Sequence, residues 1–154
     1  MFKKSRNTKI KLIRLATHYE EFETAAKVCK ILKSMGYEVG INLMQISEQS
    51  EEKINSITKI ANSVKPDVLY FADSLGSILP SDITSLIKNL RYHWKGPIGI
   101  HAHDNLKKAI DNTLEAINGG VHWVDSTITG MGRGPGNVQT EYLLIEIGNI
   151  KKKK

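Results

Sequence analysis

The sequence predicts an α/β protein made of five βα units. Two observations predict this class. Short apolar runs of strand length alternate with longer segments whose apolar residues recur at helical spacing, and no linker or change of composition interrupts the alternation. Strands that alternate with helices form parallel sheets with right-handed crossovers. An open doubly wound sheet fits this pattern, and so does part of a (β/α)₈ barrel, because a complete barrel typically needs about 250 residues and this chain has 154.

The five predicted strands are short apolar runs that end near turn-forming residues. In chain order, strands are expected over residues 10–17, 37–47, 67–74, 96–103 and 121–128. Continuous runs of Ile, Leu, Val and aromatic residues of this length fit strands of a parallel sheet. The units follow one another without a long linker, which favours a single continuous sheet.

The segments between the strands each have one apolar face, as amphipathic helices do. Helices are expected over residues 20–36, 48–66, 79–94, 105–120 and 137–148. The apolar faces of the first two consist of Phe22, Ala25, Ala26, Cys29 and Leu32, and of Ile54, Ile57, Ile60, Ala61 and Val64. Gly36 ends the first helix, and the third opens with Pro80 and Ser81, which suit the first turn.

Composition and charge exclude several classes of function. Apolar residues make up 40% and charged residues 25%, which is typical of a soluble globular protein, and no apolar run approaches the roughly 18 residues of a membrane helix. The net charge is +6, but four of the lysines form the terminal run 151–154. The sequence has no basic segment interleaved with aromatic residues, so we expect no nucleic-acid partner. We expect one domain over residues 1–150 and a basic tail over 151–154.

The chain holds one cysteine, Cys29, and its first residues lack the uninterrupted apolar segment of a signal peptide. One cysteine cannot form an internal disulfide and fits the reducing cytoplasm, where we expect this protein. Cys29 falls within a helical pattern, which favours a buried, unreactive thiol over a nucleophile.

The stretch GPIGIHAHDN, residues 96–105, ends a predicted strand with two histidines. Side chains alternate along a strand, so His101 and His103 should point the same way, with Cα atoms roughly 6.6 Å apart at about 3.3 Å per residue. Two imidazoles can close that gap onto one ion through bonds of about 2.0–2.1 Å. The alternative is a pair of surface histidines hydrogen-bonded to water.

Every predicted strand ends in polar or sulfur-bearing side chains, and the carboxyl ends of parallel strands form the rim where functional residues gather. The residues concerned are Thr17, His18, Asn42, Met44, Gln45, Asp73, Ser74, His101, His103, Asp104, Asp125 and Thr127. One such residue could cap a helix, but five consecutive strands are hard to explain by capping. Asp73 and Asp125 follow the strands beside the histidine strand and would add oxygen ligands or a general base, a combination that suits Mn, Fe, Co or Zn.

A glycine-rich loop, GMGRGPGN over residues 130–137, follows the last predicted strand and opens the last helix. Glycine lets the backbone approach a ligand closely, and the N–H groups and dipole of the helix can hold an anion. A flexible loop is the alternative, although Arg133 and Pro135 argue against it. The loop is neither a dinucleotide fingerprint, because Pro135 stands where the third glycine is needed, nor a P-loop, because G-K-[ST] is absent.

Several segments together resemble a known enzyme family. These segments are IRLATH, INLMQ, FADSLGSILP, IGIHAHDN, VDSTITGMG and GRGPGNVQTE. They are similar to parts of the metal-dependent aldolase and lyase family that includes 4-hydroxy-2-oxovalerate aldolase, HMG-CoA lyase and isopropylmalate synthase, with the aldolase branch most similar. The resemblance extends over residues 10–147 and implies a partial (β/α)₈ TIM barrel whose five βα units correspond to barrel strands four to eight.

The resemblance also implies a divalent metal, Mn or Mg, and a small-molecule 2-oxo acid as substrate. In that family the metal polarises the carbonyl and carboxylate of the substrate and stabilises the enolate formed or consumed in C–C cleavage. The positions that match the family's metal ligands are His101, His103 and Asn137, and those that match its substrate pocket are Met44, Asp73 and Ser74, with Arg133 near the anionic end of the substrate.

The sequence also departs from the family. The family's first strand carries an Asp metal ligand and an Arg that stabilises the enolate, and we expect this sequence to begin at the fourth strand; the lyase branch has a cysteine in the glycine-rich loop, which is absent here. Two functions stay open: a metal-dependent aldolase or lyase, and a catalytically incomplete fragment or split-gene subunit that self-associates or needs a second polypeptide for the missing strands. A self-sufficient site of two histidines with Asp73 or Asp125 is a third alternative.

Overall fold

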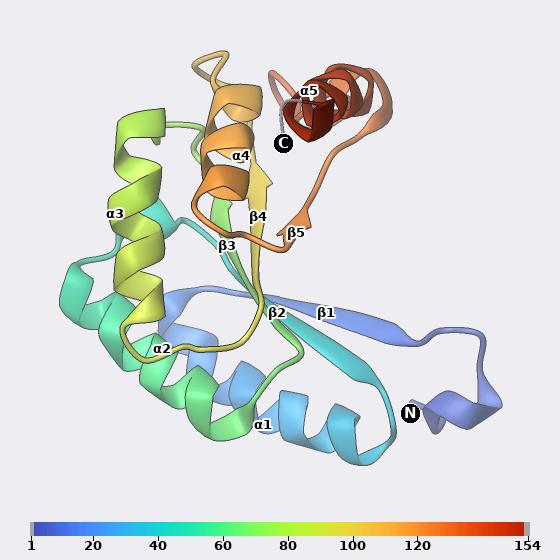
Figure 1. Ribbon diagram of the computed structural model, residues 1–154. Coiled ribbons are helices and arrows are strands. Elements are labelled where there is room, and N and C mark those ends of the chain that lie inside the picture. The colour runs from blue at the N-terminus through green and yellow to red at the C-terminus, as the bar shows by residue number, and fades with distance from the viewer. Residues whose placement is uncertain (1, 153–154) are drawn as a thin grey trace.

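A computed structural model describes residues 2–152 (Figure 1), and all five predicted strands and all five predicted helices form. The strands are β1 (Leu12–Thr17), β2 (Glu38–Leu43), β3 (Val68–Asp73), β4 (Ile98–Ala102) and β5 (Trp123–Val124). The helices are α1 (Phe22–Ser34), α2 (Glu51–Val64), α3 (Pro80–Arg91), α4 (Ala109–Asn118) and α5 (Thr140–Lys152). Short 3₁₀ turns lie at Ser5–Asn7, Tyr19–Glu21, Ile46–Glu48 and Ile128–Gly130. Between residues 2 and 152, no helix has both the length and the apolar character needed to cross a membrane.

The five strands form one parallel sheet in the order β1-β2-β3-β4-β5. In Figure 1, α1 to α4 follow one another around one side of the sheet, and each contacts the next. An open doubly wound sheet reverses its strand order at a switch point, and the described strands contain no such reversal. Sequential strands with their helices on one side are consecutive units of a (β/α)₈ barrel, so the prediction of a partial barrel is confirmed.

The hydrophobic core lies between the sheet and helices α1 to α4. Alternate strand residues point to the helix side, and these are apolar and buried. On β2, β3 and β4 they include Val39, Ile41, Leu43, Leu69, Phe71, Ile98 and Ile100. The helices contribute Phe22, Cys29, Leu32, Ile54, Ile57, Ile83 and Leu90. Burial also raises the pKa of the Cys29 thiol, as expected for an unreactive cysteine.

The opposite face of the sheet carries small and polar residues instead. Gly40 pairs in register with Arg14, and Tyr70 pairs with both Asn42 and Gly99. Gly99 makes room for its neighbour, because an added Cβ would lie 2.4 Å from Tyr70 Cδ1. In a closed barrel this face is the interior, so the side chains that meet there lie beneath the rim at the carboxyl ends of the strands.

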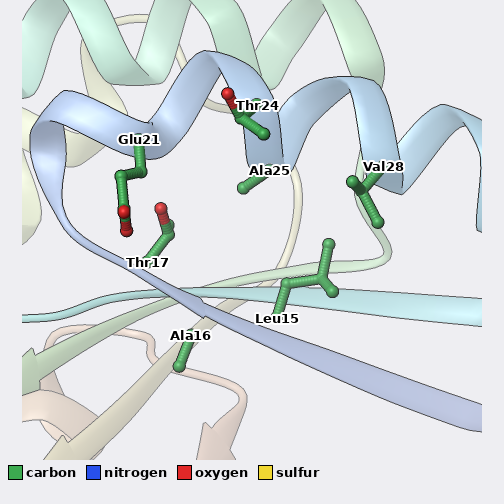
Figure 2. A pocket seen from close by; sticks show the side chains of 7 residues that line it. All are labelled: Leu15, Ala16, Thr17, Glu21, Thr24, Ala25 and Val28. Atoms are coloured by element: carbon green, nitrogen blue, oxygen red, sulfur yellow. The ribbon is translucent and has the colours of Figure 1, made fainter.

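Among the described residues, β1 and β5 each pair with another strand on one side only. Beside the free edge of β1, a groove of about 300 Å³ lies between that strand and α1. Figure 2 shows Leu15 and Thr17 pointing towards α1 while Ala16 points to the other face of the sheet. The apolar side chains of Ala25 and Val28 on α1 also line the groove and are half-buried.

Most elements are shorter than predicted by a few residues at their ends. The largest difference is the fifth strand, expected over 121–128 and formed only over Trp123–Val124. The second strand ends at Leu43 rather than at 47, because Gln45 adopts a left-handed backbone conformation (φ 52°) that leads into the 3₁₀ turn Ile46–Glu48. At the other end, α5 continues through Lys152, so part of the predicted basic tail is helical. The last two residues of that tail lie outside the described residues, and the division into 1–150 and 151–154 stays a prediction.

Candidate functional site

The carboxyl ends of β1 to β4 and the glycine-rich loop surround a cavity of about 420 Å³. The residues that line it are His18, Asn42, Met44, Gln45, Ala72, Ser74, Leu75, His101, His103 and Arg133. Five of the residues predicted as metal ligands or pocket residues are in this set, namely Met44, Ser74, His101, His103 and Arg133. The fold therefore gathers at one rim side chains that are far apart in the sequence.

The two histidines lie on the same side of the sheet, as strand alternation predicts. His101 is on β4, in register with Ala72 of β3, and His103 follows the strand. The ring centroids are 5.1 Å apart and the ring planes meet at 79°. Burial, together with the charges of His101 and Arg133, lowers the pKa of His103 below its ordinary value. A neutral imidazole is the form that binds a metal.

Asn137 lies beside this histidine pair because the glycine-rich loop folds back on itself. Its backbone forms a bridge with His103, and its N–H donates to the carbonyl oxygen of Gly130 over 3.0 Å. The side-chain Nδ2 donates to the carbonyl oxygen of Met131 over 3.3 Å, whereas Oδ1 is buried and has no hydrogen-bond partner. The close packing requires glycine at 136 (φ 95°), since a Cβ there would lie 2.2 Å from the Gly130 oxygen.

Asp73 does not line the cavity. Its side chain is 1% exposed and turns into the β3–α3 loop, where Oδ1 accepts a hydrogen bond from Ser77 N over 3.0 Å and Oδ2 accepts one from Ile78 N over 3.1 Å. The neighbouring Ser74 does line the cavity, and its Oγ accepts a hydrogen bond from Gln45 N over 3.1 Å. Asp73 thus holds the loop that carries part of the rim, which differs from the substrate contact expected of it.

Asp125 follows β5 and contacts one of the predicted metal ligands. Its Oδ2 lies 2.8 Å from His101 Nδ1 and 2.5 Å from Arg14 Nη1. Burial alone would raise the pKa of Asp125, but the hydrogen bonds from His101 and Arg14 and the charge of Arg14 bring it below its ordinary value. The Arg14 guanidinium lies 4.7 Å from the centre of the Tyr70 ring. Arg14 belongs to β1, so the sheet curves enough to bring its two edges together across this face.

The donor set at the histidine pair fits a divalent cation. The two imidazoles lie next to each other, and the backbone of Asn137, whose side-chain Oδ1 has no hydrogen-bond partner, pairs with the backbone of His103. Together the three residues would offer two nitrogens and one carbonyl-type oxygen. Over residues 2–152, no three His, Cys, Asp or Glu side chains are grouped so as to hold a metal. The self-sufficient alternative with Asp73 or Asp125 therefore does not form among these residues, since both carboxylates are engaged elsewhere.

The sequence predicts His18, Asn42 and Gln45 at the rim, without a metal-ligand or substrate-binding role for them. His18, Asn42 and Gln45 line the cavity, and Asn42 Oδ1 is buried without a hydrogen-bond partner. Arg14 has no predicted role, although the alternation of residues over 10–17 indicates the face of the sheet on which it lies. The apolar Ile13 and Leu15 flank it, so a charged residue there must point to the opposite face of the sheet.

Comparison with known proteins identifies relatives over almost the whole chain. The profile of the HMGL-like family matches residues 5–153. A 4-hydroxy-2-oxovalerate aldolase of Pelotomaculum thermopropionicum is 38% identical over 135 residues, which cover 88% of this chain and 40% of that protein. One from Carboxydothermus hydrogenoformans is 37% identical over 140 residues, covering 91% of this chain and 42% of that protein. The chain thus spans less than half the length of these relatives.

Solved structures share the fold. The N-terminal domain of a Bacteroides vulgatus protein superposes with a TM-score of 0.86 at 34% identity, over 92% of this chain and 48% of the other. HMG-CoA lyase from Brucella melitensis superposes with a TM-score of 0.79 at 14% identity, over 96% of this chain and 61% of the other. The fold, the polar rim and the profile match agree, and the chain belongs to the HMGL-like family.

Proposed function

We propose that this chain supplies the metal-binding and substrate-binding strands of a divalent-metal-dependent aldolase, which makes or cleaves a C–C bond next to a 2-oxo acid. The observation that carries the proposal is that the neighbouring rings of His101 and His103 both line one cavity, and that Asn137, whose Oδ1 is unpaired, pairs with His103 through its backbone. The identity of 38% and 37% to proteins named 4-hydroxy-2-oxovalerate aldolase supports this reaction class.

Three residues would hold the metal: the two histidines through ring nitrogens and Asn137 through its side-chain oxygen. When bound, the ion supplies a Lewis acid that withdraws electron density from the carbonyl group of the substrate. Manganese or magnesium is proposed because the amide of Asn137 and a 2-oxo acid both offer oxygen ligands, which suit these ions.

The rest of the cavity fits a small anion with a short apolar part. Arg133 brings a positive charge to the cavity wall. Ser74 Oγ accepts a hydrogen bond from Gln45 N, so its O–H is free to donate to a carboxylate. Met44 and Leu75 supply the apolar surface. These residues would orient the substrate so that its carbonyl oxygen lies towards the histidine pair.

The alternative of a catalytically incomplete subunit is favoured by the lack, in the described part of the chain, of a carboxylate ligand beside the two histidines. Over residues 2–152, no carboxylate joins the two histidines as a ligand. Loss of one preorganised stabiliser typically costs about 10²–10³ in rate. We therefore propose low activity for the 154-residue chain alone, and a partner polypeptide that contributes further βα units. The free edge of β1 and the groove of Figure 2 are where such a unit would pack, and self-association through that edge is the alternative.

We also propose that the chain works in the cytoplasm, where a protein with a single, buried cysteine needs no oxidising environment. Fluorescent tagging of the chain in its native host tests the location. A signal outside the cytoplasm would overturn this part of the proposal.

Metal binding is the first test. Calorimetric titration of the chain with Mn(II) should give saturable binding that is lost in His101→Ala and in His103→Ala, and weakened in Asn137→Ala. His122→Ala is the matched control, because His122 is exposed and absent from the cavity lining. Binding that persists in both cavity-histidine variants would place the metal elsewhere.

Activity is the second test. Pyruvate release from 4-hydroxy-2-oxopentanoate is measured by a coupled assay with Mn(II), using the chain alone and the chain mixed with a polypeptide that carries the remaining βα units of a relative. The proposal expects little turnover alone and a rise of about 10²-fold or more in the mixture, lost in His103→Ala. Robust turnover by the lone chain would overturn the need for a partner and leave the aldolase proposal intact.

A further inference from the structure

One carboxylate oxygen beside His101 accepts hydrogen bonds from two donors, His101 itself on β4 and Arg14 on the edge strand β1. Asp125 Oδ2 lies 2.8 Å from His101 Nδ1 and 2.5 Å from Arg14 Nη1. Arg14 and Asp125 are 111 residues apart in the sequence, so this contact depends on the fold as a whole. Asp125 is not among the residues that line the cavity, and the proposed metal ligands leave its role unexplained.

The contact determines which nitrogen of His101 carries the proton and which keeps a free lone pair. An ionised carboxylate only accepts hydrogen bonds, so the proton in the contact belongs to His101 Nδ1. Nε2 is then the nitrogen with a free lone pair, and His101 also lines the cavity. A metal-ligating histidine typically donates its other ring N–H to a carboxylate or carbonyl, which fixes the tautomer and the ring orientation.

The position of Asp125 is itself held by a stack of packed side chains. Arg14 is always charged and only donates hydrogen bonds, so it keeps an acceptor oxygen turned towards itself. Its guanidinium lies 4.7 Å from the centre of the Tyr70 ring. That ring lies where a side chain at position 99 would otherwise be, since a Cβ on Gly99 would approach Tyr70 Cδ1 to 2.4 Å. Packing thus extends from the sheet backbone through Tyr70 and Arg14 to Asp125.

We propose that Asp125 is a positioning residue that fixes His101 as the Nδ1–H tautomer, and that Arg14, supported by Tyr70, holds Asp125 in place for this role. The consequence for metal affinity rests on the proposed function, whereas the tautomer of His101 can be measured in the metal-free chain. Removing such an outer partner typically weakens metal binding by about 10–100-fold.

The first measurement is the tautomer of His101 by long-range proton–nitrogen NMR correlation of the metal-free chain at about pH 8. The His101 signals are assigned by their loss in His101→Gln. The wild-type chain should show Nδ1 protonated. Asp125→Leu, which has a similar shape and no acceptor, should shift the proton to Nε2. An Nδ1–H signal unchanged in Asp125→Leu would overturn the proposal.

The conservative variant makes a sharper prediction. In Asp125→Asn, Arg14 can only donate a hydrogen bond, so the amide oxygen of the new side chain should lie where Asp125 Oδ2 lies now. That oxygen still accepts from His101 Nδ1, and the Nδ1–H tautomer should persist. In the double variant with Arg14→Met, no donor orients the amide of the asparagine. Its NH₂ group can then donate a hydrogen bond to His101 Nδ1, which favours the tautomer with the proton on Nε2. This pair of variants decides the proposal even if Asp125→Leu does not fold. Identical tautomers in the single and double variants would contradict the role of Arg14.

The second measurement is Mn(II) affinity by calorimetry. Kd should rise about 10–100-fold in Asp125→Leu and less in Asp125→Asn. Asp67→Asn is the matched control, because Asp67 forms an ion pair of 3.0 Å with Lys33 away from the cavity. Loss of this ion pair should change neither the Kd for Mn(II) nor the tautomer of His101. An unchanged Kd in Asp125→Leu would overturn the consequence for binding. If the wild-type chain binds no Mn(II), the proposed function fails, while the NMR comparison still decides whether Asp125 positions the ring.

Discussion

The two faces of the same sheet are built on different chemistry. Phe71 and Tyr70 are adjacent on β3, and they are 0% and 4% exposed. Phe71 belongs to the apolar core beneath the helices, whereas Tyr70 lies under the Arg14 guanidinium on the opposite face, near the ion pair with Asp125. Similar burial therefore arises from dispersion and the hydrophobic effect on one face, and from packing around charged groups on the other.

This difference shows how one strand can serve stability and function at once. Because strand side chains alternate, residues of one parity fill the core and those of the other reach the barrel interior and the rim. On β4, Ile98 and Ile100 are buried in the core while His101 projects to the opposite face and lines the cavity. Substitutions on the two faces should therefore separate into effects on folding and effects on ligand binding.

Truncating the core face should have the largest effect on stability. Phe71→Ala removes a fully buried ring and leaves a cavity, which should lower the free energy of unfolding by about 3–5 kcal/mol. Urea unfolding followed by circular dichroism measures the change. Arg133→Ala on the exposed loop is the matched control and should stay within about 0.5 kcal/mol of the wild type. Equal losses in the two variants would contradict the division between the faces.

Asp73 tests whether a residue at the rim can serve the fold rather than the ligand. Asp73→Ala leaves the N–H groups of Ser77 and Ile78 without their acceptors, and the loss at the buried Ile78 N–H should cost about 1–3 kcal/mol. We expect a lower urea midpoint and little change in Mn(II) affinity, because the carboxylate is turned away from the cavity. Unchanged stability with weakened binding would instead support the direct role in substrate binding that the family resemblance implies.

Gly99 tests how closely the functional face is packed. Gly99→Ala forces a Cβ to within 2.4 Å of the Tyr70 ring, and such overpacking typically costs about 1–3 kcal/mol. Gly40→Ala on β2, the strand on the other side of β3, is milder, since its closest contact would be 3.1 Å, to Val68 Cγ1. Denaturant unfolding of Gly99→Ala with and without Tyr70→Leu measures the coupling. The loss should shrink in the Tyr70→Leu background, and an unchanged loss would show that the ring is not what Gly99 accommodates.

The fold could be predicted largely because its signals are local. Strand-length apolar runs and helical periodicity report on a few neighbouring residues, and they placed every element in its correct order. Periodicity did not distinguish an open sheet from a barrel segment, since both have the same alternation; the family resemblance made that choice. The end of β2 was placed too late because the left-handed conformation of Gln45 depends on the turn that follows it.

The candidate site was predictable only where local geometry sufficed. The spacing of His101 and His103 fixes their common side through strand alternation alone. The contact of Asp125 with Arg14 joins residues 111 positions apart, and it depends on sheet curvature that no short segment encodes. Asp73 presents a different difficulty, because a carboxylate at a strand end can turn towards the cavity or towards loop amides, and the sequence does not distinguish the two.

Cys29 gives the smallest expected effect, and it compares the chemical accessibility of the two faces. The thiol lies in the core beneath the helices with 0% exposure, and burial raises its pKa, so little reactive thiolate is present at about pH 8. The folded chain should therefore react with a thiol-specific disulfide reagent far more slowly than the chain in urea. Histidine-directed ethoxyformylation should meanwhile modify the cavity histidines without unfolding. Rapid thiol labelling of the folded chain would show that the core opens readily, and that the separation between the faces is weaker than the packing indicates.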